Sequence, residues 1–197
     1  MATIGLSKPY YAVYSASGND VSYTKGGELG KATEANITIN TTEDNNLYAD
    51  NGIAETERSF SDGSLTIATD DLSAEVSAAI LGLVQKEIGT IAGVSDTGVK
   101  ELVYDDDQNA PYLGIGFIIK KKHNGQYKWR GVVLTKTMFS IPSDAAVTQC
   151  ESIEWQVSNL TASIMRDDSE KHAWKKEATF TTEAQAEAYI KNRLSIA

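Results

Sequence analysis

LGIGFIIKKKHNGQYKWRGVVLTKTMF, residues 113–139, is the stretch that decides the fold. Residues alternate in both halves of it, with one phase made of Leu113, Ile115, Phe117 and Ile119 and then of Tyr127, Trp129 and Val133. Between the halves stands Asn124-Gly125, a pair favoured by two-residue type I′ turns because both turn residues need a positive φ angle. The stretch therefore predicts a long β-hairpin that turns at Asn124 and Gly125.

Alternation predicts further strands at residues 9–14, 21–24, 34–42, 64–68 and 151–165. In the last of these the apolar phase shifts near Ser158, which predicts a bulge or a bend there. Ser17-Gly18-Asn19-Asp20 is typical of a turn between the first two strands.

Two segments have the pattern of a helix. An apolar stripe recurs at helical spacing, formed by Leu72, Val76, Ala79, Ile80 and Leu83. Asp71 or Ser73 is suited to cap its N-terminus, and Gly82 lies near its end. Thr182-x-x-Gln185 resembles a capping box, which predicts a C-terminal helix ending near Leu194.

The fold class predicted is mainly β, a β-sandwich or barrel with one or two flanking α-helices. The chain of 197 residues fits a single domain, residues 1–197. A polar, acidic arm interrupts it at about residues 43–62. The sequence predicts little regular structure in this arm, and such long loops tend to be functional.

The formal net charge is −9, which argues against nucleic acid or an anionic membrane as the main partner. Charge is also unevenly distributed. Residues 43–75 contain nine acids and one base, whereas residues 120–136 contain six bases and no acid. These blocks are either two solvated surfaces or a pair of complementary faces suited to head-to-tail self-association.

No pattern of catalytic, cofactor-binding or metal-ligating residues is found. His123 and His172 have no nucleophile or ligand partner in a known arrangement, and Cys150 is the only cysteine. Asp105, Asp107 and Asn109 have calcium-loop spacing, but Ala110 and Gly116 stand where that loop needs glycine and glutamate. Gly114-x-Gly116 lacks the third glycine of a dinucleotide site. We therefore expect no enzyme, no cofactor and no metal.

Lys120, Lys121 and Lys122 with Tyr127 and Trp129 are the one candidate surface for nucleic acid. Alternation explains the aromatic residues as core, and the lysines as a charged strand end that blocks edge pairing. The N-terminus has no signal-peptide pattern, and no apolar run reaches the ~18–20 residues of a membrane helix. We therefore expect no membrane partner, and folding in the cytoplasm.

The order and spacing of several short motifs resemble the major tail protein (tail tube protein) family of siphophages that infect Gram-positive bacteria. The motifs are ITINT at 37–41, NLYAD at 46–50, IAE at 53–55, LTI at 65–67, DDLS at 70–73, IGF at 115–117, SIEW at 152–155, ATF at 178–180 and AQAEAY at 184–189. They span nearly the whole chain, but none of them carries chemistry.

The resemblance implies hexameric rings that stack into a tail tube, with strands of the subunits joined into a continuous inner barrel. It implies partners too: other copies of the chain, the tape-measure protein, and tail-tip and terminator proteins. DNA would pass through without specific binding, and the chain would be located in the virion tail after assembly from the host cytoplasm. The arm would contact the next subunit or ring through Leu47, Tyr48, Asp50, Glu55 and Glu57.

A wall that lets DNA slide should be acidic or neutral, because each bound phosphate adds to affinity. The polar phase of the strand at 151–165 makes Glu154, Gln156 and Ser158 the candidates for facing the lumen; the alternative is that they face outside solvent. Two other functions remain open. One is the inner tube of a contractile tail or a phage-tail-like bacteriocin. The other is a β-sandwich binding module, which would tend to expose aromatic residues in loops.

Overall fold

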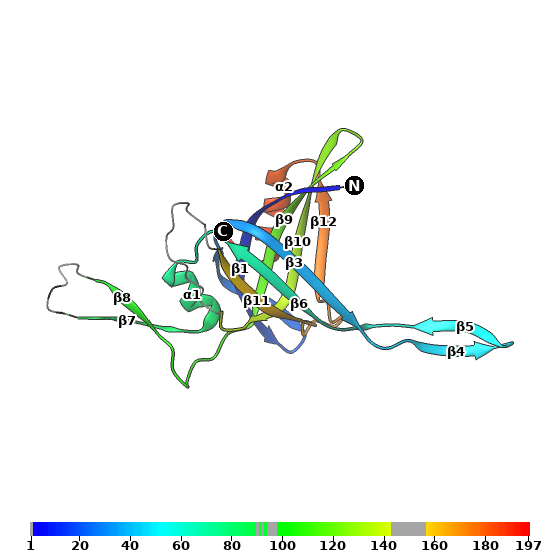
Figure 1. Ribbon diagram of the computed structural model, residues 1–197, viewed down its shortest axis with the longest axis horizontal. Helices are drawn as coiled ribbons and strands as arrows, with labels where there is room; N and C mark the ends of the chain where they lie inside the picture. The colour runs from blue at the N-terminus through cyan, green and yellow to red at the C-terminus, as the bar shows by residue number, and fades with distance from the viewer. Residues whose placement is uncertain (1, 90, 92, 94–97, 143–156) are drawn as a thin grey trace, which may run out of the picture.

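The computed structural model describes residues 2–89, 91, 93, 98–142 and 157–197, and it is mainly β with two helices, as predicted. Eight strands form one antiparallel sheet in the order β2-β1-β9-β10-β11-β6-β3, with β12 also paired to β10 (Figure 1). Their bounds are β1 Ala2–Ser17, β2 Asp20–Glu28, β3 Ala32–Thr41, β6 Phe60–Thr69, β9 Leu113–His123, β10 Gln126–Phe139, β11 Ser158–Met165 and β12 Lys175–Phe180.

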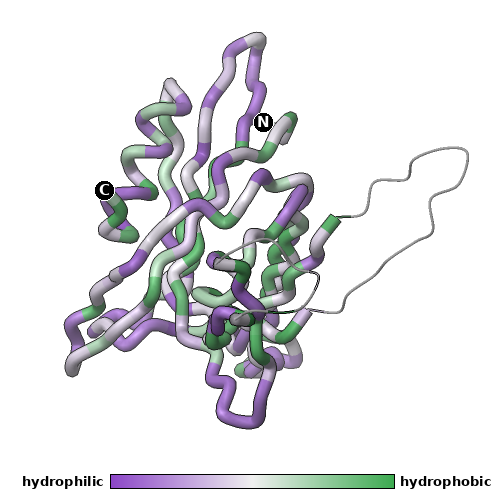
Figure 2. The backbone as a smooth tube through the Cα atoms, turned by 90° about the vertical axis from the view of Figure 1, so that its left-hand side faces the viewer, coloured by the Kyte–Doolittle hydropathy of each residue, from purple (hydrophilic) through white to green (hydrophobic). Residues whose placement is uncertain are grey.

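The hairpin predicted at residues 113–139 is confirmed. β9 and β10 pair from Gln126↔His123 to Thr137↔Leu113. Asn124 and Gly125 form the turn with φ angles of 48° and 79°, as a type I′ turn requires. Figure 2 shows that the tip of this hairpin, at the top, is hydrophilic, whereas hydrophobic residues lie along the strands below it.

One edge of β10 is shared by two strands, and this divides the sheet into two layers. β12 pairs with residues 129–134 of β10, and β11 pairs with residues 136–139. The layer of β11, β6 and β3 then covers one face of β9 and β10, where Ile115, Phe117 and Leu134 are fully buried. The opposite face carries a second cluster, which includes Ile118 and Val133. The central hairpin is therefore buried on both faces.

Helix α1 (Ala74–Leu81) closes one end of the first cluster, and its caps agree with the sequence. The Val76 backbone N–H donates to the Ser73 hydroxyl at 3.3 Å, so Ser73 is the N-cap rather than Asp71. Gly82 ends the helix in the left-handed region with a φ of 68°. A β-carbon there would lie 2.1 Å from the Asn109 carbonyl oxygen. This position therefore requires glycine both for its positive φ angle and for its close contact with Asn109.

Helix α2 (Glu183–Arg193) covers the second cluster, and Thr182 caps it by accepting the Gln185 backbone N–H at 3.3 Å. The helix approaches closely because the strands beneath it carry glycines at Gly114, Gly116 and Gly131. A β-carbon at Gly116 would lie 2.4 Å from Ile190 Cγ2, far inside van der Waals contact. The G-x-G pattern in β9 thus serves helix packing.

Most of the other strand predictions are confirmed with longer bounds, but the β7–β8 sheet was not predicted. β7 (Val84–Glu87) and β8 (Lys100–Val103) pair with each other in an antiparallel sheet of two strands. Each strand has only four residues and too few apolar positions for alternation to reveal it. Its detectable feature is charge, since Lys86 faces Glu101 and Glu87 faces Lys100.

Substitution of Gly116 by alanine tests the packing of α2. We expect Gly116→Ala to lower the free energy of unfolding by about 1–3 kcal/mol, because Ile190 is a branched residue on a helix and cannot move aside freely. Denaturant unfolding measures this. Gly5→Ala is the matched control in β1, where the nearest atom, Lys120 Cβ, would be 3.6 Å from the new β-carbon. Equal stability of both variants would contradict the packing account.

Candidate functional site

The acidic arm is a β-hairpin, so the expectation of little regular structure is wrong. β4 (Asn45–Ala49) and β5 (Gly52–Glu57) pair only with each other and project away from the body (Figure 1). Their turn is Asp50-Asn51, with φ angles of 49° and 63°. Alternation failed to reveal these strands because both faces of the hairpin are exposed, so neither phase needs to be apolar.

The arm hairpin, residues 45–57, leaves large apolar side chains in solvent. Leu47, Tyr48 and Ile53 are 60%, 68% and 57% exposed, and every residue of β5 is exposed. Of the residues predicted to contact a neighbouring subunit, Leu47 lies directly opposite Glu55 in the hairpin register, and Asp50 lies in the turn. Glu57 lies opposite Asn45 near the root.

An ion pair closes the root of the arm hairpin. The Arg58 guanidinium donates to both carboxylate oxygens of Asp44, with Nη2 2.6 Å from Oδ2. This pairing lowers the pKa of Asp44 below its usual value. Beyond it, the Thr42 backbone N–H donates to the Ser59 carbonyl at 2.9 Å and continues the ladder toward β3 and β6. The arm hairpin is therefore a direct extension of the β3–β6 pair.

Basic and aromatic side chains line the tip of the β9–β10 hairpin. Tyr127 was expected in the core, but it is 46% exposed. Lys120 Nζ lies 4.6 Å from the Tyr127 ring centroid and 5.7 Å from that of Trp129, and Lys122 Nζ lies 5.6 Å from Tyr127. Two cations thus lie within cation–π distance of these rings, while Tyr127 stays exposed.

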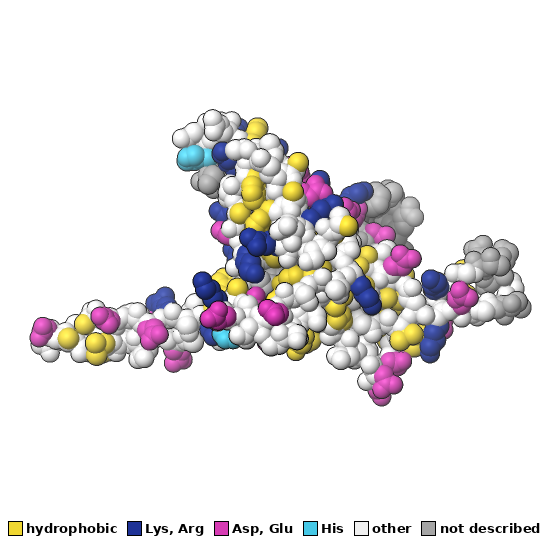
Figure 3. Space-filling view, turned by 180° about the vertical axis from the view of Figure 1, so that it is seen from behind, with side chains coloured by type: hydrophobic (Ala, Val, Ile, Leu, Met, Phe, Trp, Pro, Cys, Tyr) yellow, Lys and Arg dark blue, Asp and Glu magenta, His cyan; other side chains and the backbone are white. Residues whose placement is uncertain are grey.

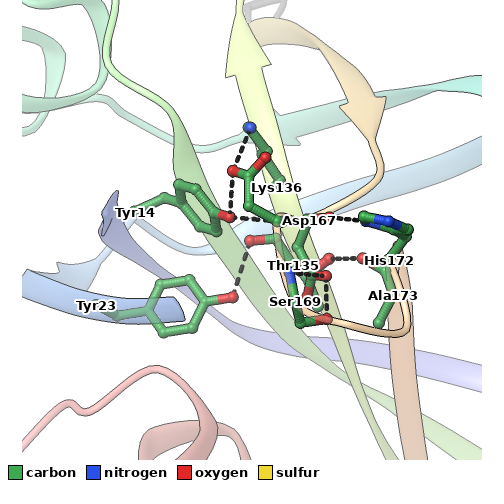
Figure 4. Close-up of polar contacts among 9 residues, drawn as sticks. Tyr14, Tyr23, Thr135, Lys136, Asp167, Ser169, His172 and Ala173 are labelled. Atoms are coloured by element: carbon green, nitrogen blue, oxygen red, sulfur yellow. Dashed lines mark hydrogen bonds and ion pairs between the residues drawn. The ribbon is translucent and has the colours of Figure 1, made fainter. Parts of the chain in front are cut away.

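A partly buried polar cluster fastens the loop between β11 and β12 to the sheet (Figure 4). The Tyr14 hydroxyl donates to Asp168 Oδ2 at 2.7 Å and accepts the Asp168 backbone N–H at 2.9 Å. Lys136 Nζ donates to the same carboxylate at 2.7 Å. On the next strand the Tyr23 hydroxyl donates to the Thr135 carbonyl at 2.9 Å. No sequence pattern predicts this cluster, because its members come from distant segments with no shared motif.

The cluster shifts two pKa values. The bonds from Lys136, and then from Tyr14, hold the pKa of Asp168 below its usual value, so its stabilising contribution exists above the unfolded-state pKa and is lost in acid. Burial raises the pKa of Tyr14 to about 12. The contribution of Tyr14 to the free energy of unfolding is complete below the unfolded-state pKa of 10.0 and is lost as pH rises toward 12.

Other residues singled out by sequence lie apart from these surfaces. His123 and His172 are exposed. Ser158 is exposed at the first position of β11. Glu154, Gln156 and Cys150 lie outside the described residues. So do residues 151–156 of the predicted strand. Leu160, Ala162 and Ile164 of β11 are fully buried, as the shifted apolar phase predicts.

Nothing in the described ranges gathers three or more His, Cys, Asp or Glu side chains in a way that could hold a metal. Neither helix of those ranges is long and apolar enough to cross a membrane. No protein-family model matches the chain, and no curated protein sequence matches it.

Loss of the Tyr14 hydroxyl should weaken the fold. We expect Tyr14→Phe to lower the free energy of unfolding by about 1–2 kcal/mol at neutral pH, because the Asp168 backbone N–H and carboxylate each lose a partner. The decline in stability as pH rises from 10 toward 12 should also become shallower. Tyr112→Phe is the control, since Tyr112 also lies under Lys136 but is 44% exposed. Equal losses in both variants would contradict this role.

Proposed function

We propose that the chain is a structural protein that assembles with copies of itself into a tube, as the tail-tube proteins of siphophages do. The arm hairpin is the observation that carries this proposal. A two-stranded hairpin alone is at best marginally stable in water, and this one also exposes Leu47, Tyr48 and Ile53. Burial of these side chains against another subunit would stabilise both the arm and the assembly.

The open edges of the sheet support the same proposal. β2 and β3 end the strand order, and within the described residues neither pairs with a further strand on its outer side. Open edges favour pairing with another chain, and closure of a sheet into a barrel removes them. In a ring of subunits, such pairing would create the continuous inner barrel that the resemblance implies.

The proposed tube is a conduit in the virion tail. Alternation in the sequence makes Glu154, Gln156 and Ser158 the residues proposed for its wall. A net charge of −9 per subunit suits a wall past which DNA slides. The tape-measure, tail-tip and terminator proteins are the further partners proposed. The inner tube of a contractile particle would use the same architecture and the same contacts.

Self-assembly should depend on concentration, because ring stacking is a heterologous contact that does not close. We expect sedimentation of the purified chain to change from monomer to large particles as concentration rises, and negative-stain electron microscopy to show rings or tubes. A chain that stays monomeric at high concentration, even when seeded with tail-tip components, would contradict the proposal. Binding of such monomers to a glycan array would instead support a binding module.

Removal of the arm hairpin should separate folding from assembly. We expect replacement of residues 45–57 by Asn-Gly, a short turn between Asp44 and Arg58, to leave thermal unfolding nearly unchanged, because the removed residues are almost all exposed. The shortened protein should no longer form particles that sediment. Asn46→Ala with Thr56→Ala is the control, since the Thr56 hydroxyl donates to Asn46 Oδ1 on the face of the arm hairpin away from Leu47. Normal assembly of the shortened protein would rule out the arm as a contact.

A further inference from the structure

A basic pocket lies at the root of the arm hairpin, where β6 begins beside the loop that leads into β12. Its walls include Arg166, Lys171 and Lys175 around the rings of Phe60 and Trp174, and its volume is about 370 Å³. Figure 3 shows basic side chains gathered where the arm joins the body. A concave surface lined by cations and by two aromatic rings is suited to an acidic ligand that also carries an apolar side chain.

Internal contacts hold the residues that line the basic pocket in place. The Phe60 and Trp174 rings are stacked, with centroids 4.7 Å apart and planes 8° from parallel. The Arg166 guanidinium donates to the Phe60 carbonyl oxygen and lies 5.8 Å from the Phe60 ring centroid. Among the residues that the structure describes, Arg166 and Lys171 have no carboxylate in ion-pair contact. Two cations are thus available to a ligand.

One face of the arm hairpin has the complementary chemistry. Leu47 pairs with Glu55, and Asn45 pairs with Glu57, so these four side chains share a face. Neither Glu55 nor Glu57 has an ion-pair partner within the described ranges, and both are exposed. The face therefore offers two free carboxylates beside one apolar side chain.

We propose that this face of one copy's arm hairpin binds the basic pocket of a second copy. Glu55 and Glu57 pair with Arg166 and Lys171, and Leu47 packs against the stacked rings of Phe60 and Trp174. Arginine binds carboxylates with two parallel hydrogen bonds, which gives such a contact direction as well as strength. The inference rests on the proposed self-assembly and names the contact by which it occurs.

A second copy is the occupant because the chain's own arm hairpin projects away from the body (Figure 1), whereas the basic pocket lies at its root. Tip and root are different surfaces of one molecule, so their contact is heterologous and continues from copy to copy into rings or stacks. The other basic surface, the β9–β10 tip, fits less well. It is a protruding turn, and its Lys120 already covers Tyr127 and Trp129.

Exchange of charge between the two surfaces tests the contact. One variant carries Glu55→Lys and Glu57→Lys, and the other carries Arg166→Glu and Lys171→Glu. Each alone juxtaposes like charges, so we expect the concentration needed for assembly, measured by sedimentation, to rise about tenfold or more. An equal mixture of the two should recover assembly, because each arm then meets a pocket of opposite charge. A single chain with all four substitutions should also recover it.

Controls keep folding and contact distinct. Thermal unfolding checks each variant, and Lys171→Glu alone replaces the double pocket variant if Arg166→Glu fails to fold. Asn46→Lys with Thr56→Lys adds positive charge on the other face of the arm hairpin and should assemble like the wild type. The proposed contact is wrong if the wild type and both charge-reversed variants assemble at the same concentration. It is also wrong if neither the mixture nor the variant with four substitutions recovers assembly. In both cases the proposed self-assembly still holds. A wild-type chain that remains monomeric overturns both the contact and the proposed self-assembly.

Discussion

Burial of the β9–β10 hairpin on both faces is the constraint on which the rest of the structure depends. One face packs under the layer of β11, β6 and β3, and the other packs under α2. The forked edge of β10 makes this arrangement possible, since β12 and β11 follow one another along it. Small residues then set the spacing, because Gly114, Gly116 and Gly131 let the helix approach the strands.

Because the body is stable through its own two apolar clusters, it can carry hairpins that add little to the stability of the chain. The arm hairpin, the β7–β8 hairpin and the β9–β10 tip all extend beyond the two apolar clusters. The arm hairpin contributes little to its own chain, since its apolar side chains remain in solvent. Its sequence is therefore free to serve contacts with other molecules. The acids Glu55 and Glu57 are opposite in charge to Arg166 and Lys171 of the basic pocket at its root.

The sequence predicted features that local chemistry determines. Asn124-Gly125, Ser73, Gly82 and Thr182 act through their own backbone geometry or a neighbouring N–H, and each lies where predicted. Features set by tertiary contact were missed. Tyr14 and Asp168 meet across more than half of the chain, and Phe60 meets Trp174 in the same way. The arm strands were missed for another reason, since alternation reports burial and these strands have none.

The arm hairpin is exposed in the single chain, and the proposed assembly would cover it. Hydrogen exchange of backbone amides, compared between monomer and assembled particles, tests it most directly. We expect residues 45–57 to exchange rapidly in the monomer and to become protected on assembly, while residues 113–119 stay protected in both states. Equal and rapid exchange of residues 45–57 in monomer and particles would contradict the claim.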